Sequence, residues 1–290
     1  MSDATRQETS MRPATGEKVV EKVRERYGLI AEGKISGCCG VAAAPDDRRA
    51  AEASIACEVG YSADDLAAAP QGANLGLGCG APIAFLKPAA GETVVDLGSG
   101  GGLDAFLAAR EVGPQGRVIG VDMTPSMLER ARRAAGEAGL ANVEFREGRL
   151  ERLPVDDASV DAVTSNCVIN LVPDKSVVFR EVARVLRPGG RLVVSDVILD
   201  GALPEVVAND VLAYVGCIAG ALPRARYFGM ITAAGLAEVT IFKDVDYLAS
   251  GGYAMPEELQ ARMNEAGVTA DDLRGVVRSV TYRAIKPQSK

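Results

Sequence analysis

Hydrophobic residues first fall into a regular pattern near residue 17. Between Glu17 and Ala31 they lie at helical spacing with charged residues between them, which predicts an amphipathic helix packed on the rest of the molecule. A short helix is expected over 61–69, where Ser62 can cap the first turn. The glycine-rich segment 72–82 cannot form a stable helix and is expected to be a loop.

From residue 90 onward, short apolar runs alternate with stretches of helical spacing. Strands are expected at 92–97, 117–122, 143–147, 159–165 and 191–198. Helices are expected over 103–113, from Pro125 after the cap Thr124, and from Asp174, the last with Val177, Val178, Val182 and Val185 facing inward. This alternation is typical of a doubly wound α/β fold, in which helices cover both faces of a parallel sheet.

The remaining chain is expected to be mainly helical, over 204–219 and 224–235, before two strands at 237–245 and 276–284. These two strands bring the expected sheet to seven. We divide the chain into an N-terminal portion with a tail, a helix and cysteine-bearing loops (1–80), a central α/β domain (81–200), and a C-terminal helical portion that includes the last two strands (201–290).

Composition excludes several classes of protein. Of 290 residues, 48% are hydrophobic and none is histidine, which rules out a histidine general base, a Ser-His-Asp triad and a histidine-ligated zinc. The net charge of −7 argues against a nucleic-acid partner held by phosphate contacts. Since the sequence shows neither a membrane-length apolar run nor a secretion signal, we expect a cytoplasmic protein without a membrane partner.

Six cysteines remain as candidate reactive groups. They are Cys38, Cys39, Cys57, Cys79, Cys167 and Cys217. In a reducing cytosol they are expected to be thiols, and the absence of a C-x-x-C motif argues against a zinc ribbon or a thioredoxin-type site. Taken singly, each could also be a small buried hydrophobe.

A glycine-rich loop, DLGSGGGLD (96–104), follows the first expected strand. Its glycines let the backbone turn sharply and approach a ligand closely, and Asp122, at the end of the second strand, can accept hydrogen bonds from ribose hydroxyls. A dinucleotide site and a purely structural turn are alternatives. Asp96 disfavours a dinucleotide, because a carboxylate there repels a pyrophosphate and attracts an ammonium or sulfonium group.

The D-L-G-S-G segment together with Asp122 resembles the first motifs of the class I S-adenosylmethionine (SAM) methyltransferases, over about residues 90–200. The resemblance implies a Rossmann-like SAM-binding fold for 81–200. It places Asp96, Gly98, Ser99, Gly100 and Asn166 near the methionine part of the cofactor, Asp122 at the ribose, and Met123 and Leu150 on the two faces of the adenine. Met123 and Leu150 could equally be ordinary core residues.

Two of the cysteines stand at positions suited to an acceptor site. Cys167 follows the fourth expected strand, at the sheet edge where open α/β folds bind ligands, and Cys217 ends the helical segment after the fifth strand. Only tertiary structure can bring them together.

Four segments together resemble the arsenite methyltransferases, which transfer a methyl group from SAM to trivalent arsenic. They are GANLGLGCG (72–80), VIGVDMTP (118–125), SNCVINLVPDK (165–175) and GCIAGAL (216–222). The resemblance runs from about residue 17 to 245. It implies that Cys167 and Cys217 bind arsenic, and that Cys79 is an additional ligand that forms a disulfide with a cysteine further upstream.

The upstream cysteines depart from the family pattern, because this chain has three where the family has one clear cysteine. We favour Cys39 as the partner of Cys79 and leave Cys38 and Cys57 open, since adjacent cysteines rarely form a relaxed disulfide with each other. Cys57 could instead be buried beside its apolar neighbours.

The implied chemistry suits these residue types. Trivalent arsenic is soft and prefers sulfur ligands, and its lone pair can attack a sulfonium methyl without removal of a proton. Transfer oxidises arsenic, and a thiol pair that closes to a disulfide can return the electrons, with glutathione or thioredoxin as the external reductant. Two alternatives remain: a methyltransferase for another small nucleophile, and a non-catalytic thiol module that sequesters arsenic.

Overall fold

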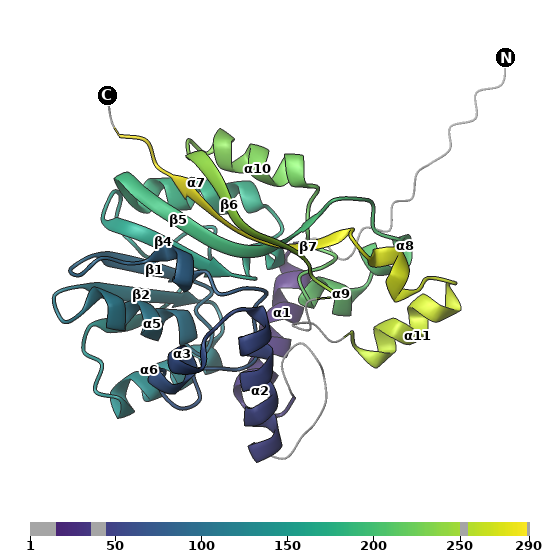
Figure 1. Ribbon diagram of the computed structural model, residues 1–290, viewed down its shortest axis with the longest axis horizontal. Helices are drawn as coiled ribbons and strands as arrows, with labels where there is room; N and C mark the ends of the chain where they lie inside the picture. Colours follow the sequence, from purple (N-terminus) through teal and green to yellow (C-terminus); the bar gives the residue numbers. More distant parts are fainter. Residues whose placement is uncertain (1–15, 36–44, 250–254, 289–290) are drawn as a thin grey trace.

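A seven-stranded sheet runs through the computed structural model, which describes residues 16–35, 45–249 and 255–288. The strand order is β3-β2-β1-β4-β5-β7-β6 (Figure 1). The strands are β1 (Thr93–Leu97), β2 (Arg117–Asp122), β3 (Val143–Glu147), β4 (Val160–Asn166), β5 (Leu186–Leu199), β6 (Ala237–Asp246) and β7 (Val277–Ile285). The first five pair in parallel, whereas β7 pairs antiparallel with both β5 and β6. The expected seven-stranded α/β fold is confirmed.

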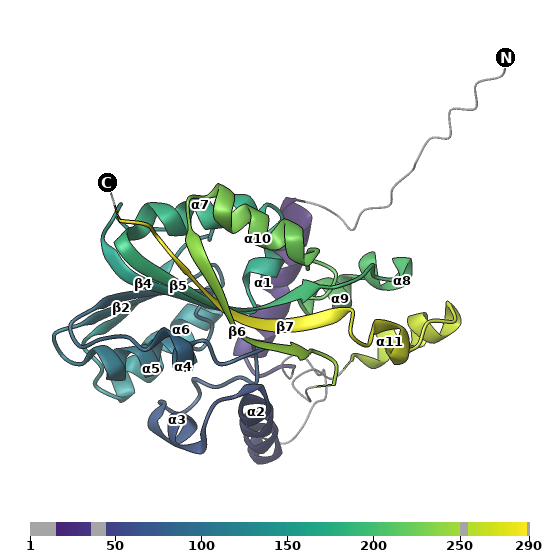
Figure 2. The ribbon, with the colours of Figure 1, turned by 45° about the horizontal axis from the view of Figure 1, so that its top comes forward.

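Helices cover both faces of the sheet, as Figure 2 shows. One face carries α7 (Lys175–Val185) and α10 (Arg224–Ala233); the other carries α4 (Ile83–Leu86), α5 (Leu103–Val112) and α6 (Pro125–Glu137). Each face has its own apolar core, in which valines and leucines of the strands pack against the inward side of the helices. The two layers keep the parallel strands dry on both sides.

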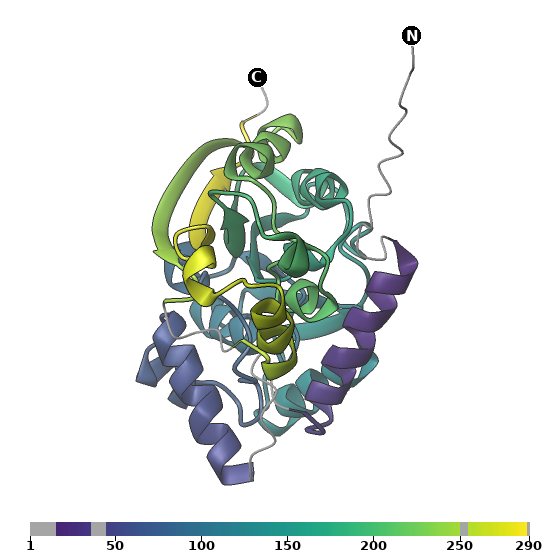
Figure 3. The ribbon, with the colours of Figure 1, turned by 90° about the vertical axis from the view of Figure 1, so that its right-hand side faces the viewer.

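A third apolar cluster lies beyond the carboxyl end of the parallel strands. Around this end lie α1 (Glu17–Ala31), α2 (Pro45–Val59), η1 (Ile169–Leu171), α8 (Glu205–Ala208), α9 (Val211–Val215), α11 (Glu257–Glu265) and η2 (Ala270–Leu273). Leu66 of α3 (Ala63–Ala68) packs instead against the core on the α4 and α5 face. Figure 3, which looks onto this end, shows α1 in purple on one side and α2 in blue on the other. The functional residues expected from the sequence gather here.

One helical prediction was wrong in its extent. The segment 204–219 is not a single helix, because α8 ends before Asp210, whose side chain accepts hydrogen bonds from the amides of Leu212 and Ala213 and so caps α9. Aspartate favours this cap over a helix interior. The second carboxylate oxygen of Asp210 pairs with Arg262 of α11, which anchors the break.

The inward face of α7 also differs slightly from the prediction. Val178, Val182 and Val185 are buried, but Val177 is only half-buried and Phe179 takes its place in the core. Positions 178, 182 and 185 lie on one helical stripe with 179, and position 177 lies off it. The expected domain boundaries at 80 and 200 stay predictions.

Along the described ranges, no helix combines the length and the apolar character that a membrane crossing requires.

Candidate functional site

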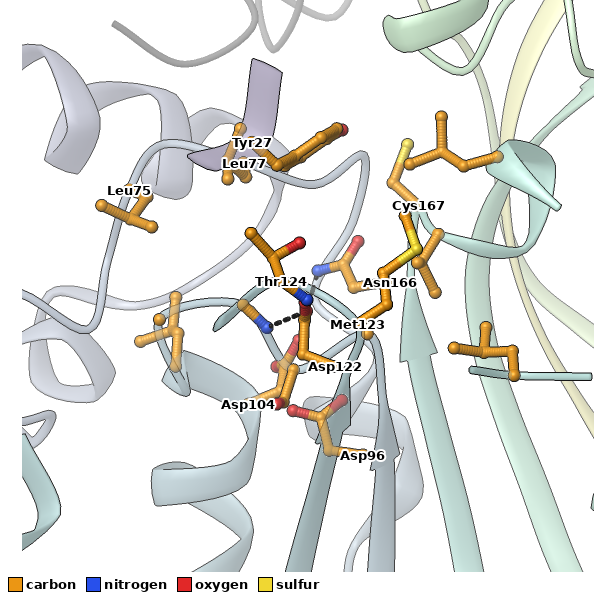
Figure 4. Close-up of a pocket in the computed structure, with 18 of the residues that line it drawn as sticks. Tyr27, Leu75, Leu77, Asp96, Asp104, Asp122, Met123, Thr124, Asn166 and Cys167 are labelled. Atoms are coloured by element: carbon orange, nitrogen blue, oxygen red, sulfur yellow. Dashed lines mark hydrogen bonds between the residues drawn. The ribbon is translucent and has the colours of Figure 1, made fainter. Parts of the chain in front are cut away.

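A cleft with about 1060 Å³ of empty space opens at the carboxyl ends of β1, β2 and β4, where open α/β sheets bind their ligands. The glycine-rich loop and Asp122 form one side, and Asn166, Cys167 and Val168 form another. Figure 4 shows Asp96, Asp104 and Asp122 grouped at one end and Cys167 away from them. The cleft therefore has a carboxylate end and a thiol end.

Asp122 holds the glycine-rich loop to the end of β2. Its Oδ2 accepts a hydrogen bond from the amide of Gly100 at 2.9 Å, and its Oδ1 accepts one from the amide of Thr124 at 2.8 Å. Burial raises the pKa of Asp122, and these hydrogen bonds oppose the shift. Each oxygen keeps a further lone pair with which to accept a ligand hydroxyl.

Asp96 and Asp104 complete the carboxylate end. Burial raises the pKa of Asp96 well above its usual range, and the charges of Asp104 and Asp122 raise it further. Burial also raises the pKa of Asp104 to about 6, although hydrogen bonds from Tyr61 and Asn166 favour its charged form. Each of these three buried carboxyl groups disfavours the ionisation of its neighbours. A cationic group of a ligand would therefore be stabilised here.

The remaining lining fits SAM. Ser99 is buried in the wall of the cleft, and its hydroxyl has no hydrogen-bond partner within the described part of the chain, as expected where a ligand supplies one. Gly98 has a φ of 65°, and a Cβ there would lie 2.4 Å from Val168, so no other residue fits. Met123 and Leu150 supply apolar surface for a flat ring.

Three thiols from distant parts of the chain contact one another at the other end. Cys167 lines the cleft, and its side chain contacts those of both Cys79 and Cys217. Burial raises the pKa of Cys79, and contact with Cys217 is the main cause that raises the pKa of Cys167. Both thiols are thus held in the neutral, protonated form.

Of the three thiols, Cys167 is the one that contacts both of the others. In the described ranges, no group of three or more cysteine, histidine or acidic side chains is arranged to hold a metal ion. A soft substrate atom would therefore need the side chains to rotate toward a common point.

The backbone at two of these cysteines is strained. Cys167 has a φ of 56° and Cys217 a φ of 65°, in the left-handed region that residues other than glycine rarely adopt. Each such residue costs on the order of 1–3 kcal/mol and persists only where its surroundings hold it. Such residues are concentrated at functional sites.

Asn166 connects the third thiol to the sheet. Its Oδ1 accepts a hydrogen bond from the amide of Cys79 at 3.1 Å, and its Nδ2 donates to the carbonyl oxygen of Gly80 at 2.7 Å. From the other side, Ser279 of β7 donates to the carbonyl oxygen of Cys79 at 2.5 Å. The loop that carries Cys79 is therefore fastened to β4 and to β7.

The structure brings most of the predicted site residues into one region. All eight predicted cofactor residues line the cleft: Asp96, Gly98, Ser99, Gly100, Asp122, Met123, Leu150 and Asn166. Cys39 and Cys38 lie outside the described residues. The alternative that Cys57 is buried is wrong, because it is exposed on α2 while Ala56 and Val59 face the core.

The lining residues that were not selected from the sequence include a buried hydrogen-bonded pair. Tyr61 and Asp104 both line the cleft and are hydrogen-bonded to each other. Asp104 ends the glycine-rich motif, so its position was a usable signal, whereas nothing near Tyr61 in the sequence indicates its role.

The sequence of this chain is similar to those of known methyltransferases. Residues 88–265 match a family described as a methyltransferase domain. An arsenite methyltransferase of Halobacterium salinarum is 47% identical over 244 residues, 81% of this chain and 61% of that protein. One from Aquipseudomonas alcaligenes is 45% identical over 152 residues, 50% of this chain and 43% of that protein. The chain thus spans less than two thirds of the length of either relative.

A solved structure is also similar to this chain. The crystal structure of an arsenic(III) S-adenosylmethionine methyltransferase from Chlamydomonas reinhardtii matches with a TM-score of 0.57 and 32% sequence identity, covering 85% of this chain and 75% of that one.

Proposed function

The chain belongs to the arsenite methyltransferase family of SAM-dependent methyltransferases, and we propose that it transfers the methyl group of SAM to trivalent arsenic bound by its own thiols. The observation that carries this proposal is the contact of Cys167 with Cys79 and Cys217 beside a cleft whose far end is lined by carboxylates. The whole activity, including substrate and reductant, is part of the proposal.

When bound, SAM supplies an electrophilic methyl group on a sulfonium sulfur. The protein's part would be to hold and orient it: Asp96 would bind the ammonium end, Asp122 would accept hydrogen bonds from the ribose hydroxyls, and Met123 and Leu150 would flank the adenine. Ser99 offers a further hydrogen bond. These groups account for the predicted cofactor function of the central portion, 81–200.

The thiols bind the substrate by ligand exchange. Each neutral thiol replaces one hydroxide of arsenous acid, and its proton leaves with that hydroxide as water. The raised pKa values of Cys79 and Cys167 suit this exchange, because no free thiolate has to be buried. Sulfur ligands suit trivalent arsenic because both are soft. Cys217 comes from the C-terminal portion, 201–290, which is the predicted substrate portion.

In the transfer step, the arsenic lone pair would form a bond to the methyl carbon of bound SAM while the carbon–sulfur bond breaks, and S-adenosylhomocysteine would leave. No proton is removed, so a chain without histidine loses nothing. Apolar residues of α1, α9 and β5 surround the thiols and exclude water from them. Positioning and water exclusion are therefore the protein's main contributions.

The transfer leaves arsenic formally pentavalent, and two electrons must return to it. Two of its thiolate ligands can supply them by leaving as a disulfide. Cys79 then exchanges with an upstream cysteine, Cys39 in our preferred assignment and Cys38 or Cys57 otherwise. An external thiol, glutathione or thioredoxin, resets the pair.

Purified protein incubated with SAM, glutathione and arsenite tests the proposal, with methylated arsenic detected by chromatography and mass spectrometry. We expect methylated product from the unsubstituted chain. The Cys167→Ser variant should form none, yet bind SAM normally by calorimetry. SAM binding without any arsenic methylation would contradict the proposed substrate and favour a different small nucleophile.

A further inference from the structure

A continuous chain of hydrogen bonds joins the carboxylate end of the cleft to the loop of Cys79. The hydroxyl of Tyr61 lies 2.8 Å from each carboxylate oxygen of Asp104, to which it donates. The same hydroxyl accepts a hydrogen bond from Nδ2 of Asn166 at 2.8 Å. Asn166 in turn binds the backbone on both sides of the Cys79–Gly80 peptide bond.

The Asn166 amide makes this chain specific. Its two Nδ2 hydrogens are matched by two short acceptors, the Tyr61 hydroxyl at 2.8 Å and the Gly80 carbonyl at 2.7 Å. Its Oδ1 accepts from the Cys79 amide. Nδ2 also makes a longer contact with Oδ2 of Asp104 at 3.3 Å. Without the Tyr61 hydroxyl, one amide hydrogen would keep only this weaker contact, and the amide would be held less firmly against the loop.

Asp104 gives the chain its sensitivity to a ligand. It lines the cleft together with Asp96, and in this buried place the charge of Asp104 disfavours the ionisation of Asp96. A cationic group that enters beside them stabilises ionised Asp104. A hydrogen bond to an ionised acceptor is shorter and stronger than one to a neutral acceptor, so the Tyr61 hydroxyl is then held more firmly.

We propose that Tyr61 and Asp104 are positioning residues that link the placement of the Cys79 thiol to the presence of the cofactor's ammonium group in the cleft. This inference rests on the proposed function in so far as the ligand is SAM. Its consequence is an order of assembly: the third thiol is fully held in place only after the methyl donor has bound.

The test measures how readily Cys79 is alkylated. Cys79 is only 3% exposed, so N-ethylmaleimide reaches it only when the loop opens, and its alkylation rate reports that opening. The full-length protein is labelled at about pH 5.5, below the pKa of about 6 of Asp104, so that a bound cation can increase the ionised fraction of this carboxyl group, and Cys79 is followed by peptide mass spectrometry. The ligand is S-adenosylhomocysteine, which carries the ammonium group but has no methyl to transfer.

For the unsubstituted chain, we expect saturating S-adenosylhomocysteine to slow alkylation of Cys79 about three- to tenfold, the worth of one hydrogen bond. Methylthioadenosine, which lacks the amino-acid end, should leave the rate unchanged when calorimetry shows that it fills the cleft. Equal slowing by both ligands would overturn the inference, because the ammonium would then have no part in it.

Three variants locate the effect. Tyr61→Phe should alkylate faster than the unsubstituted chain and lose the response to S-adenosylhomocysteine. Asp104→Asn, which keeps an oxygen acceptor but no charge, should lose the response while its basal rate stays close to normal. Tyr282→Phe is the matched control, because it removes a buried hydroxyl that, within the described ranges, is hydrogen-bonded to the Tyr227 hydroxyl, and its response should be unchanged.

A response retained in Tyr61→Phe would overturn the inference, as would a response lost equally in Tyr282→Phe. None of these measurements involves arsenic. If S-adenosylhomocysteine changes the Cys79 rate as expected but no methylated arsenic forms, then the proposed substrate fails and the positioning role stands. If the ligand does not bind at all by calorimetry, the proposed function fails first.

Discussion

The thiol of Cys217 donates a hydrogen bond to the main-chain carbonyl oxygen of Cys167 at 2.8 Å, across 50 residues of chain. Both residues have left-handed backbone, and both lie just beyond the end of a regular element, β4 in one case and α9 in the other. The contact holds the Cys217 sulfur against the main chain of Cys167 before any substrate arrives, and the two side chains also contact each other. An arsenic site at this point would thus need only side-chain rotation.

Substitution of Cys217 by serine tests the proposed arsenic ligands. Serine keeps a donor for the Cys167 carbonyl oxygen but offers hard oxygen in place of soft sulfur. We expect arsenite affinity, measured by equilibrium dialysis with elemental mass spectrometry, to fall at least about a hundredfold as one arm of the chelate is lost. Cys57→Ser, at the exposed cysteine on α2, should bind arsenite normally. Unchanged binding by Cys217→Ser would contradict the assignment.

Asp122→Asn tests the ribose and loop contacts of the cofactor site. The amide keeps one acceptor but loses the charge that binds the Gly100 and Thr124 amides. We expect SAM affinity by calorimetry to fall about ten- to a hundredfold, as for a lost charge-assisted hydrogen bond. Asp174→Asn, which alters only the exposed cap of α7, should leave the affinity unchanged. An equal effect of the two substitutions would mean that Asp122 acts only through stability.

Gly80→Ala tests how tightly the Cys79 loop is packed. A Cβ at this position would lie 2.4 Å from Oγ and 2.6 Å from Cβ of Ser195, so the loop has to move away from β5. We expect a loss of about 1–3 kcal/mol in the free energy of unfolding and faster alkylation of Cys79. Gly136→Ala, in α6 with open space around it, should instead stabilise the protein by up to about 1 kcal/mol. A neutral Gly80→Ala would show that the loop is loose.

The carboxylate end predicts a pH dependence of stabilisation by ligand. The pKa of Asp104 is raised to about 6, and that of Asp96 is raised as well. Both groups hold their protons more tightly when the protein is folded than when it is unfolded, so their contribution to stability is complete below about pH 4. The contribution of Asp104 is lost as the pH rises through about 6.

An ammonium group bound beside the two carboxylates offsets that loss. S-adenosylhomocysteine should therefore raise the melting temperature more at pH 8 than at pH 5, which calorimetric melting curves can measure. In Asp104→Asn, the ligand-induced rise in melting temperature should differ less between pH 5 and pH 8. A ligand-induced shift that is the same at both pH values would contradict the buried-carboxylate explanation.

Much of the fold was predictable because its determinants are local. The helix Glu17–Ala31 and the cap at Ser62 depend on neighbours a few residues away, and both formed as predicted. The glycine-rich loop and Asp122 were recognisable because they follow strands directly. The predicted single helix over 204–219 was wrong because the cap at Asp210 is supported by Arg262 of α11, which is distant in sequence.

In the candidate site, too, some features follow from local sequence and others from contacts between residues that are distant in sequence. The sequence by itself determined the residue types, the alternation of strands and helices between about residues 90 and 200, and the exclusion of histidine chemistry, since these follow from composition and short-range spacing. Only the tertiary structure decided that Cys217 contacts Cys167 and that Asn166 reaches the Tyr61 hydroxyl 105 residues away. Such contacts depend on how the whole core packs. The strained backbone of Cys167 and Cys217, for example, persists only where the surrounding layers hold it.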